Sequence, residues 1–348
     1  MKKVKYYFIL IFLTVISQGY AQTDDFTDTS KVEWKTFEEV QKLFSEKQKP
    51  VYIFLYDNKN DSSRIMLNQT FGLEEVANYI NVLFYPIKLE IHTKDTIRFF
   101  DNRLYIPLKN GIHGLAFKLA GDTIPVPPAS VVFSREAVGT VYKGFKDRDH
   151  IFPILIYYAE DVNKAVTYDE FEKYYFKTYP PGRKQIMTRV LVKWKSIEEA
   201  FDTTKTIKKK IFVNLYDNYK ITCTMMRLKT YNNPVIAKYL NEKFYPVNID
   251  IRMKDTVHIF NQTFVFNEKF GFHQLAISFL GGKMKMPAFL VFDENGKFLD
   301  KKQEYMTPEN FEPLIRFVGD NAYKKMKFTE YLKTFKSSFE ENTKKTNP

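Results

Sequence analysis

The sequence predicts two α/β domains in tandem. First, the chain repeats itself after about 160 residues, which is the length of a domain and not of a solenoid repeat. Second, each copy alternates short apolar runs with helical stretches, the order expected of parallel strands joined by a crossover. Third, 44% of the 348 residues are hydrophobic and only 13 are Gly and 15 are Pro. That composition supplies enough apolar surface for two cores.

The repeat rests on aligned residues. Subtracting 160 places the Leu-Tyr-Asp-Asn of 215–218 on the Leu-Tyr-Asp-Asn of 55–58. Other identical pairs at this offset are Trp34 and Trp194, Met66 and Met226, Tyr79 and Tyr239, and His113 and His273. The predicted domains are residues 32–179 and 188–345. Residues 180–187 form the predicted linker, in which two prolines and a glycine end the preceding helix.

Residues 1–21 are predicted to be a signal peptide that is cleaved after Ala21. Three lysines precede an apolar run from Tyr6 to Ile16, and small residues follow it. The alternative is a membrane anchor, but the run is shorter than the ~20 residues that span a bilayer. No cysteine lies near residue 21, so a lipid anchor is not expected. We therefore expect a periplasmic or otherwise exported protein with no stable transmembrane anchor after cleavage.

Each copy predicts the same elements in the same order. "PVYIFLY" and "KIFVNLY" are buried strands, each followed by a polar turn and a helical stretch to about Tyr79 or Tyr239. "VLFYPIKLEI" and "KFYPVNIDI" are second strands, and "GLAFKLAG" and "QLAISFLG" are short helices. "PASVVF" and "PAFLVF" are third strands. "DRDHIFPILIYYAED" and "TPENFEPLIRFVGD" are closing helices, and "TYDEFEKYYFKTY" and "FTEYLKTFKSSF" are helical tails.

Charge and cysteine content exclude several classes of protein. The net charge is +12, but most lysines are scattered, which favours a solubilising surface over nucleic-acid binding. A weak attraction to anionic surfaces or acidic partners stays open. The single cysteine cannot form an internal disulfide. The five histidines are dispersed, so no metal site is predicted, and nothing in the sequence indicates a cofactor.

The stretch "VNLYDNYKITC" from Val213 resembles the strand and active-site turn of thioredoxins, which run from "VDFWA" into "WCGPCK". In this alignment Tyr219 takes the tryptophan position, Lys220 the first cysteine and Cys223 the second. In the first copy, Asn60 and Ser63 take the two cysteine positions.

The prolines of the third strands complete the resemblance. Pro128 and Pro287 match the cis-proline that faces the redox pair in this family. More specifically, the chain resembles exported thioredoxin-like proteins of Bacteroidota, through the helix starts at Trp34 and Trp194, the segments "GIHGLAFKLAG" and "GFHQLAISFLGG", and the Tyr- and Phe-rich tails. The resemblance implies that each domain has a central mixed sheet flanked by helices and followed by a helical tail. It also implies that Asn60, Ser63 and Lys220 are degenerate active-site positions.

Dithiol exchange needs two thiols, because the first attacks the substrate disulfide and the second resolves the mixed disulfide. Neither copy has both. The leading hypothesis is therefore a peptide-binding or chaperone-like module of the cell envelope that binds exported proteins or peptides. The extended backbone beside Pro128 and Pro287 would pair with the partner, and Tyr56, Tyr216 and Tyr219 would add apolar contact.

Two other functions stay open. Cys223 could be the catalytic residue of a monothiol isomerase or thiol sensor, which requires an exposed thiol with a low pKa. The opposing interpretation is that Cys223 is a small buried hydrophobic residue. The chain could also be a structural accessory subunit of an envelope assembly, docked through its lysines. Enzyme activity is thus not required by the sequence, and the oligomeric state is not predicted.

Overall fold

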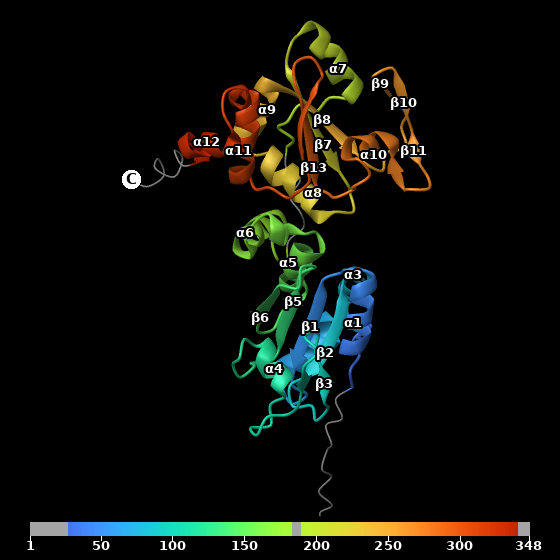
Figure 1. Ribbon diagram of the computed structural model, residues 1–348, viewed down its shortest axis with the longest axis vertical. Helices are drawn as coiled ribbons and strands as arrows, with labels where there is room; N and C mark the ends of the chain where they lie inside the picture. The colour runs from blue at the N-terminus through green and yellow to red at the C-terminus, as the bar shows by residue number, and fades with distance from the viewer. Residues whose placement is uncertain (1–26, 183–188, 340–348) are drawn as a thin grey trace, which may run out of the picture.

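The computed structural model describes residues 27–182 and 189–339, which form two α/β units (Figure 1). We call residues 27–182 unit 1 and residues 189–339 unit 2. The expected signal peptide of 1–21 and most of the expected linker lie outside the described residues. In the described part of the chain, no helix combines the length and the apolar character that crossing a membrane requires.

Unit 1 contains six α-helices, a π-helical segment, a 3-10 turn and six strands among the described residues. They are α1 (Phe37–Glu46), β1 (Val51–Tyr56), α2 (Asp61–Ile65), η1 (Met66–Thr70), α3 (Glu74–Leu83), β2 (Tyr85–Glu90), β3 (Ile97–Arg98), β4 (Leu104–Tyr105), α4 (Gly114–Leu119), β5 (Ala129–Phe133), β6 (Gly139–Lys143), α5 (Arg148–Ala159), η2 (Val162–Lys164) and α6 (Tyr168–Thr178).

Unit 2 repeats this order and adds a second small hairpin. Its elements are α7 (Ile197–Thr206), β7 (Lys210–Tyr216), α8 (Ile221–Met225), η3 (Met226–Tyr231), α9 (Pro234–Lys243), β8 (Phe244–Asp250), β9 (Val257–Ile259), β10 (Gln262–Phe264), β11 (Phe266–Asn267), β12 (Phe272–His273), α10 (Gln274–Leu280), β13 (Ala288–Phe292), β14 (Phe298–Lys302), α11 (Pro308–Gly319), η4 (Ala322–Lys324) and α12 (Phe328–Thr334).

Each unit has a four-stranded mixed sheet with the same topology. The strand orders are β2-β1-β5-β6 and β8-β7-β13-β14. The central strands β1 and β7 pair in parallel with β2 and β8 and antiparallel with β5 and β13. The register places Ala129 opposite Leu55 and Ala288 opposite Leu215. The chain therefore enters β5 and β13 at the end of the sheet where β1 and β7 finish and α2 and α8 follow.

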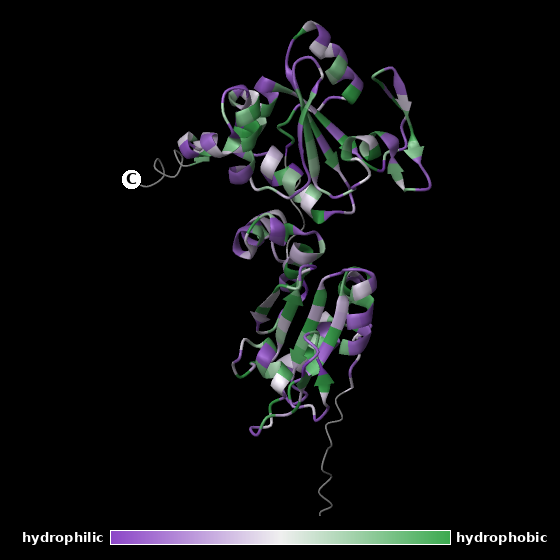
Figure 2. Ribbon diagram, viewed as in Figure 1, coloured by the Kyte–Doolittle hydropathy of each residue, from purple (hydrophilic) through white to green (hydrophobic). Residues whose placement is uncertain are grey.

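Burial explains why these segments are strands. Every residue of β13 is buried, as are the first five residues of β1 and the first six of β7. Strands covered by helices on both faces read as continuous apolar runs, and the strands are correspondingly the most hydrophobic part of each unit (Figure 2). The predicted strands and the parallel crossover are confirmed.

The helix after the central strand is broken, where the sequence predicted one continuous stretch. In unit 1, α2 runs into the π-helical η1, and a turn at Gly72 separates η1 from α3. A Cβ at Gly72 would lie 2.1 Å from the backbone oxygen of Asn68, so only glycine fits this turn. In unit 2 the break falls at Asn232, and Asn233 and Pro234 start α9 with an N-cap side chain and a proline at N1.

The two units share an apolar core. Helices α5 and α6 of unit 1 lie between the two sheets, next to α8 of unit 2 (Figure 1). The ring of Phe171 is fully buried and contacts Tyr157 of its own unit and Tyr305 of unit 2, with centroid distances of 5.7 and 5.8 Å. One contiguous cluster of buried side chains accordingly includes residues from both units.

Polar contacts border this core. The hydroxyl of Tyr174 donates to both carboxylate oxygens of Glu309, at 2.5 and 2.6 Å. The hydroxyl of Thr307 donates to Glu170 at 2.9 Å. Thr307 is itself the N-cap of α11, so the same side chain caps a helix of unit 2 and binds unit 1.

We expect Phe171→Ala to lower the free energy of unfolding by about 3–5 kcal/mol, because it leaves a cavity in the core that joins the units. Urea unfolding followed by tryptophan fluorescence measures this loss. Leu332→Ala is the control, since Leu332 is 45% exposed, and it should change stability by less than about 0.5 kcal/mol. Equal effects of the two changes would show that Phe171 does not join the units.

Candidate functional site

The turn and helix start after each central strand hold the residues that the sequence aligned with a thioredoxin active site. We call residues 56–63 the unit 1 corner and residues 216–223 the unit 2 corner. In unit 1, Asn60 caps α2: its side-chain oxygen accepts from the N–H of Ser63 at 2.9 Å. In unit 2, Lys220 holds the N-cap position and its ammonium group cannot accept a hydrogen bond. The first N–H groups of α8 therefore need an acceptor from elsewhere.

Glu160 of unit 1 supplies that acceptor. It lies at the C-cap of α5, and its carboxylate accepts from the backbone N–H groups of Ile221 and Thr222 at 3.1 and 3.0 Å. The hydroxyl of Thr222 donates to the same carboxylate. Glu160 is only 6% exposed, and Thr222 is fully buried. A carboxylate of unit 1 thus covers the helix start at which a thioredoxin-type nucleophile would lie.

The buried position of Glu160 disfavours the ionised form of its carboxyl group. Burial raises the pKa of the carboxyl group above its ordinary value of 4.5. The charge of Lys220 and the hydrogen bonds from Thr222 and Ile221 act in the opposite direction, but burial is the largest effect. Lys220, although it cannot cap α8 itself, favours the ionised form of the residue that does.

Cys223 is buried and has a structural contact. It is 3% exposed, and its Sγ accepts from the N–H of Asp217 at 3.5 Å. Burial raises the pKa of the thiol to about 12, and the nearby charges of Glu160 and Asp217 also raise it. At neutral pH the group is therefore a thiol, whereas nucleophilic attack on a disulfide requires a thiolate.

Ser63 forms the equivalent contact in unit 1. It is fully buried, and its Oγ accepts from the N–H of Asp57 at 3.3 Å. Ser63 and Cys223 thus occupy equivalent positions and stabilise equivalent turns, which is a sufficient structural reason for a small acceptor side chain at this place.

Of the three tyrosines predicted near the corners, only Tyr219 is well exposed, at 81%. The guanidinium of Arg252 lies 5.2 Å from its ring centroid and forms a two-pronged ion pair with Asp217, at 3.1 Å for each contact. Tyr56 and Tyr216 are half-buried. Burial raises the pKa of Tyr56 to about 12, and its ring stacks on Phe54.

The proline segments before β5 and β13 differ sharply between the units. The bonds Pro127–Pro128 and Met286–Pro287 are both cis, as predicted. In unit 1, the side chains of Ile124 and Val126 are each 64% exposed. The backbone N–H and C=O of Val126 have no hydrogen-bond partner among residues 27–182 and 189–339.

In unit 2 the equivalent segment is closed. The side-chain amide of Gln303 donates to the carbonyl oxygens of Lys283 and Lys285, at 2.5 and 3.2 Å. Met286, which precedes the cis bond, is only 5% exposed. The carbonyl oxygens of Lys283 and Lys285 are therefore already hydrogen-bonded within unit 2.

Sequence reasoning named the two corners and the prolines but not three residues that control access to them. Glu160, Gln303 and Val126 lie outside every motif. For Val126 the sequence does contain a signal, the stretch "IPVPP". Proline that alternates with apolar residues favours an extended segment that cannot join the interior of a sheet. No local signal identifies Glu160, since its partner lies 61 residues away.

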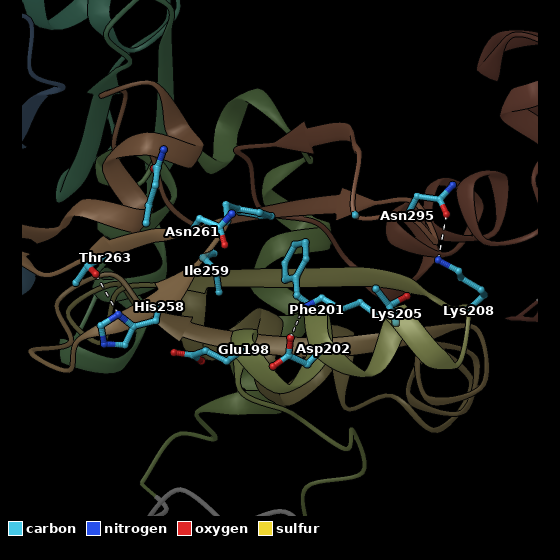
Figure 3. Close-up of a pocket in the computed structure, with 14 residues that line it drawn as sticks. Glu198, Phe201, Asp202, Lys205, Lys208, His258, Ile259, Asn261, Thr263 and Asn295 are labelled. Atoms are coloured by element: carbon cyan, nitrogen blue, oxygen red, sulfur yellow. Dashed lines mark hydrogen bonds and ion pairs between the residues drawn. The ribbon is translucent and has the colours of Figure 1, made fainter.

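A separate groove of about 570 Å³ lies in unit 2 between α7, the β9–β10 hairpin and the β13–β14 turn (Figure 3). Phe201 rises from α7 and meets the ring of Phe260 edge-on at 4.8 Å. The rim side chains bind one another, as Lys208 does with Asn295 and His258 with Thr263. None of the predicted site residues lines this groove, and its contacts are those of a hairpin packed on a helix.

No family model matches the chain, and no curated protein matches it. Solved structures that it resembles are thioredoxin-fold proteins. A thioredoxin-fold protein from Helicobacter pylori is 17% identical, with 36% of this chain and 84% of that chain covered and a TM-score of 0.29. A DsbH oxidoreductase is 15% identical, covers 41% of this chain and 98% of its own, and has a TM-score of 0.29. Full-length ERdj5 is 8% identical, with 85% of this chain and 32% of that chain covered and a TM-score of 0.27.

We expect Glu160→Gln to remove a pH dependence from the stability of the protein. The pKa of Glu160 is raised in the folded state, so the folded protein keeps this proton at pH values where the unfolded chain has lost it. The wild type should therefore be most stable relative to Glu160→Gln below about pH 4.5. This advantage should fall as the pH rises through the folded-state pKa.

Urea unfolding of both proteins across this pH range measures the difference. Asp320→Asn is the matched control, because Asp320 is the C-cap of α11 at the equivalent place and its side chain is 44% exposed. A difference between wild type and Glu160→Gln that does not vary with pH would contradict the assignment.

We expect Cys223 to react slowly with an aromatic disulfide reagent at pH 7.5 in the native protein and quickly in urea, since its thiol is buried and protonated. Absorbance of the released thiolate follows the reaction. The control is the double variant Cys223→Ser, Tyr219→Cys. Its single thiol lies at an exposed position two residues before α8 and should react at once. Comparable native rates for the two thiols would show that Cys223 is accessible.

Proposed function

We propose that this chain is an exported protein of two thioredoxin-like domains that has lost disulfide exchange and binds an extended segment of another exported protein. The shared topology of the two sheets supports the assignment of both units to this fold. In each unit a central strand has one parallel and one antiparallel neighbour, and a helix starts directly after it.

The chemistry of the corners argues against thiol–disulfide exchange. Unit 1 has Asn60 and Ser63 where the fold family has cysteines, and Asn60 is committed to capping α2. Unit 2 has one thiol, whose pKa is raised to about 12, behind the buried carboxylate of Glu160. A monothiol isomerase or sensor needs an exposed thiol with a low pKa, and this environment disfavours both properties.

The observation that carries the binding proposal is the contrast between the two proline segments. Val126 presents an unpaired N–H and C=O beside a 64% exposed side chain, whereas Gln303 covers the equivalent backbone in unit 2. An exposed extended segment with free backbone groups is a template for strand addition. Prolines on both sides of Val126 leave few other donors, which limits the added strand to a short contact.

This contrast supports binding by unit 1, with unit 2 as its support. Two binding edges on one chain would have favoured avidity, but α6 and Glu160 cover the unit 2 corner and Gln303 covers its proline segment. The partner we propose is therefore an extended, partly apolar stretch that pairs with residues 124–127 and contacts Ile124 and Val126.

We expect Val126→Asp to weaken binding of a permanently unfolded, carboxymethylated protein at least tenfold, because a charge replaces the apolar contact at the pairing edge. Fluorescence anisotropy of the labelled protein measures the affinity. Lys285→Asp, at the equivalent position of unit 2, and Cys223→Ser should bind as the wild type does. Loss of binding in Lys285→Asp alone would move the site to unit 2, and loss of binding in Cys223→Ser would contradict the proposal, because the unit 2 corner would then contribute to the contact.

A further inference from the structure

The positive charge of this protein lies in one of its two units. Residues 27–182 contain 20 Lys and Arg and 21 Asp and Glu, whereas residues 189–339 contain 26 and 16. Unit 1 is therefore close to neutral, and unit 2 carries nearly all of the net charge. A charge partition of this kind favours association of the basic unit with anionic surfaces.

Within unit 2, the lysines concentrate on the turn and helix that end the described chain. We call residues 322–336 the basic tail; it contains η4 and α12 and lies at the outer edge of unit 2 (Figure 1). The basic tail has one acidic residue, Glu330, and five lysines. The lysines are Lys324, Lys325, Lys327, Lys333 and Lys336. None of them forms an ion pair with another residue in the ranges the structure describes.

The equivalent segment of unit 1, residues 162–176, has two lysines and three acidic residues. Lys164 there pairs with Glu136 and Asp161. Its counterpart Lys324 has Asn321 where Lys164 has Asp161, and Glu294, whose carboxylate interacts electrostatically with Lys324, forms its ion pair with Lys210. The helix of that segment, α6, is covered by unit 2, whereas no residue of α12 is buried. The two copies of one segment thus differ in charge and in exposure together.

The basic tail also exposes apolar side chains among its lysines. Met326 and Leu332 are 40% and 45% exposed. The rings of Phe328 and Tyr331 are half-buried against Phe317, at centroid distances of 5.2 Å each. Long lysine stems beside exposed apolar groups are typical of segments that lie at a membrane surface, where the ammonium groups reach the headgroups and the apolar groups enter the boundary.

We infer that the basic tail binds the surface of a membrane that contains anionic lipids. The recognised chemistry is the negatively charged phosphate headgroup, met by five unpaired ammonium groups over a short distance. A membrane surface accounts for both observations, because its headgroups are anionic and the layer beneath them is apolar, and an acidic protein is the alternative that polyglutamate tests. The contact lies on unit 2 and leaves residues 124–127 of unit 1 free.

The test is sedimentation of the chain lacking residues 1–21 with two kinds of vesicle, phosphatidylcholine with phosphatidylglycerol and phosphatidylcholine alone. We expect binding to the anionic vesicles only, and weaker binding as salt is raised. The double change Lys325→Glu and Lys333→Glu should weaken the binding at least tenfold, because two attractive contacts with headgroups are lost and each reversal also adds repulsion.

The matched control is Lys254→Glu with Lys269→Glu, which changes the net charge equally on two exposed residues near the β9–β12 hairpins, away from α12 (Figure 1). It should change binding less than twofold. Equal losses in the two double variants would overturn the inference, since net charge alone would then explain binding. Equal binding to neutral vesicles would also overturn it. So would polyglutamate that competes for the chain as effectively as an added excess of anionic vesicles does.

Leu332→Ala separates the lipid from other anions. It should weaken vesicle binding two- to fivefold and leave retention on a cation-exchange resin unchanged, because it removes only the apolar contact. Unchanged vesicle binding would refute the apolar part of the contact. This inference and the function proposed for unit 1 can fail separately. The double lysine variant should still bind the carboxymethylated unfolded protein, and Val126→Asp should still bind anionic vesicles.

Discussion

The arrangement of this protein depends on one requirement of helix chemistry: the first N–H groups of a helix must have acceptors. Lys220 cannot provide one for α8, and Glu160 of the other unit does. Because a buried carboxylate without its hydrogen bonds would be very costly, Glu160 and α8 need each other. The position of unit 1 on unit 2 follows from this bond and from the aromatic core around Phe171, and so does the closure of the unit 2 corner.

The two units thus differ at equivalent places. The unit 1 corner caps itself through Asn60 and leaves the neighbouring proline segment open. The unit 2 corner has become part of an interface inside the chain, and Gln303 satisfies the backbone that remains. Ser63 and Cys223 form the same contact in the two turns, since each accepts from the backbone N–H six residues earlier. The two corners therefore share this geometry although different side chains form it.

The sequence predicted much of this fold, because strands such as 51–56 and 211–215 are continuous apolar runs and the repeat fixes their equivalence. It missed the break at Gly72, which depends on how close Asn68 comes in three dimensions. The corner residues were predictable from their spacing after the strand. Access to them was not, because Glu160 and Gln303 act on residues far away in sequence or on backbone atoms. A glutamate at a helix end looks the same in a sequence whether it meets water or the helix of another unit.

The hydrogen bonds of Glu160 also have a consequence for any variant of position 220. A cysteine introduced there would create the sequence Cys-Ile-Thr-Cys, but the carboxyl group of Glu160 would still lie over the helix start. Access to the new sulfur atom would therefore depend on a residue of the other unit. Exposing it would need a second change at position 160, and that change alone would leave the first N–H groups of α8 without their acceptor and weaken the contact between the two units.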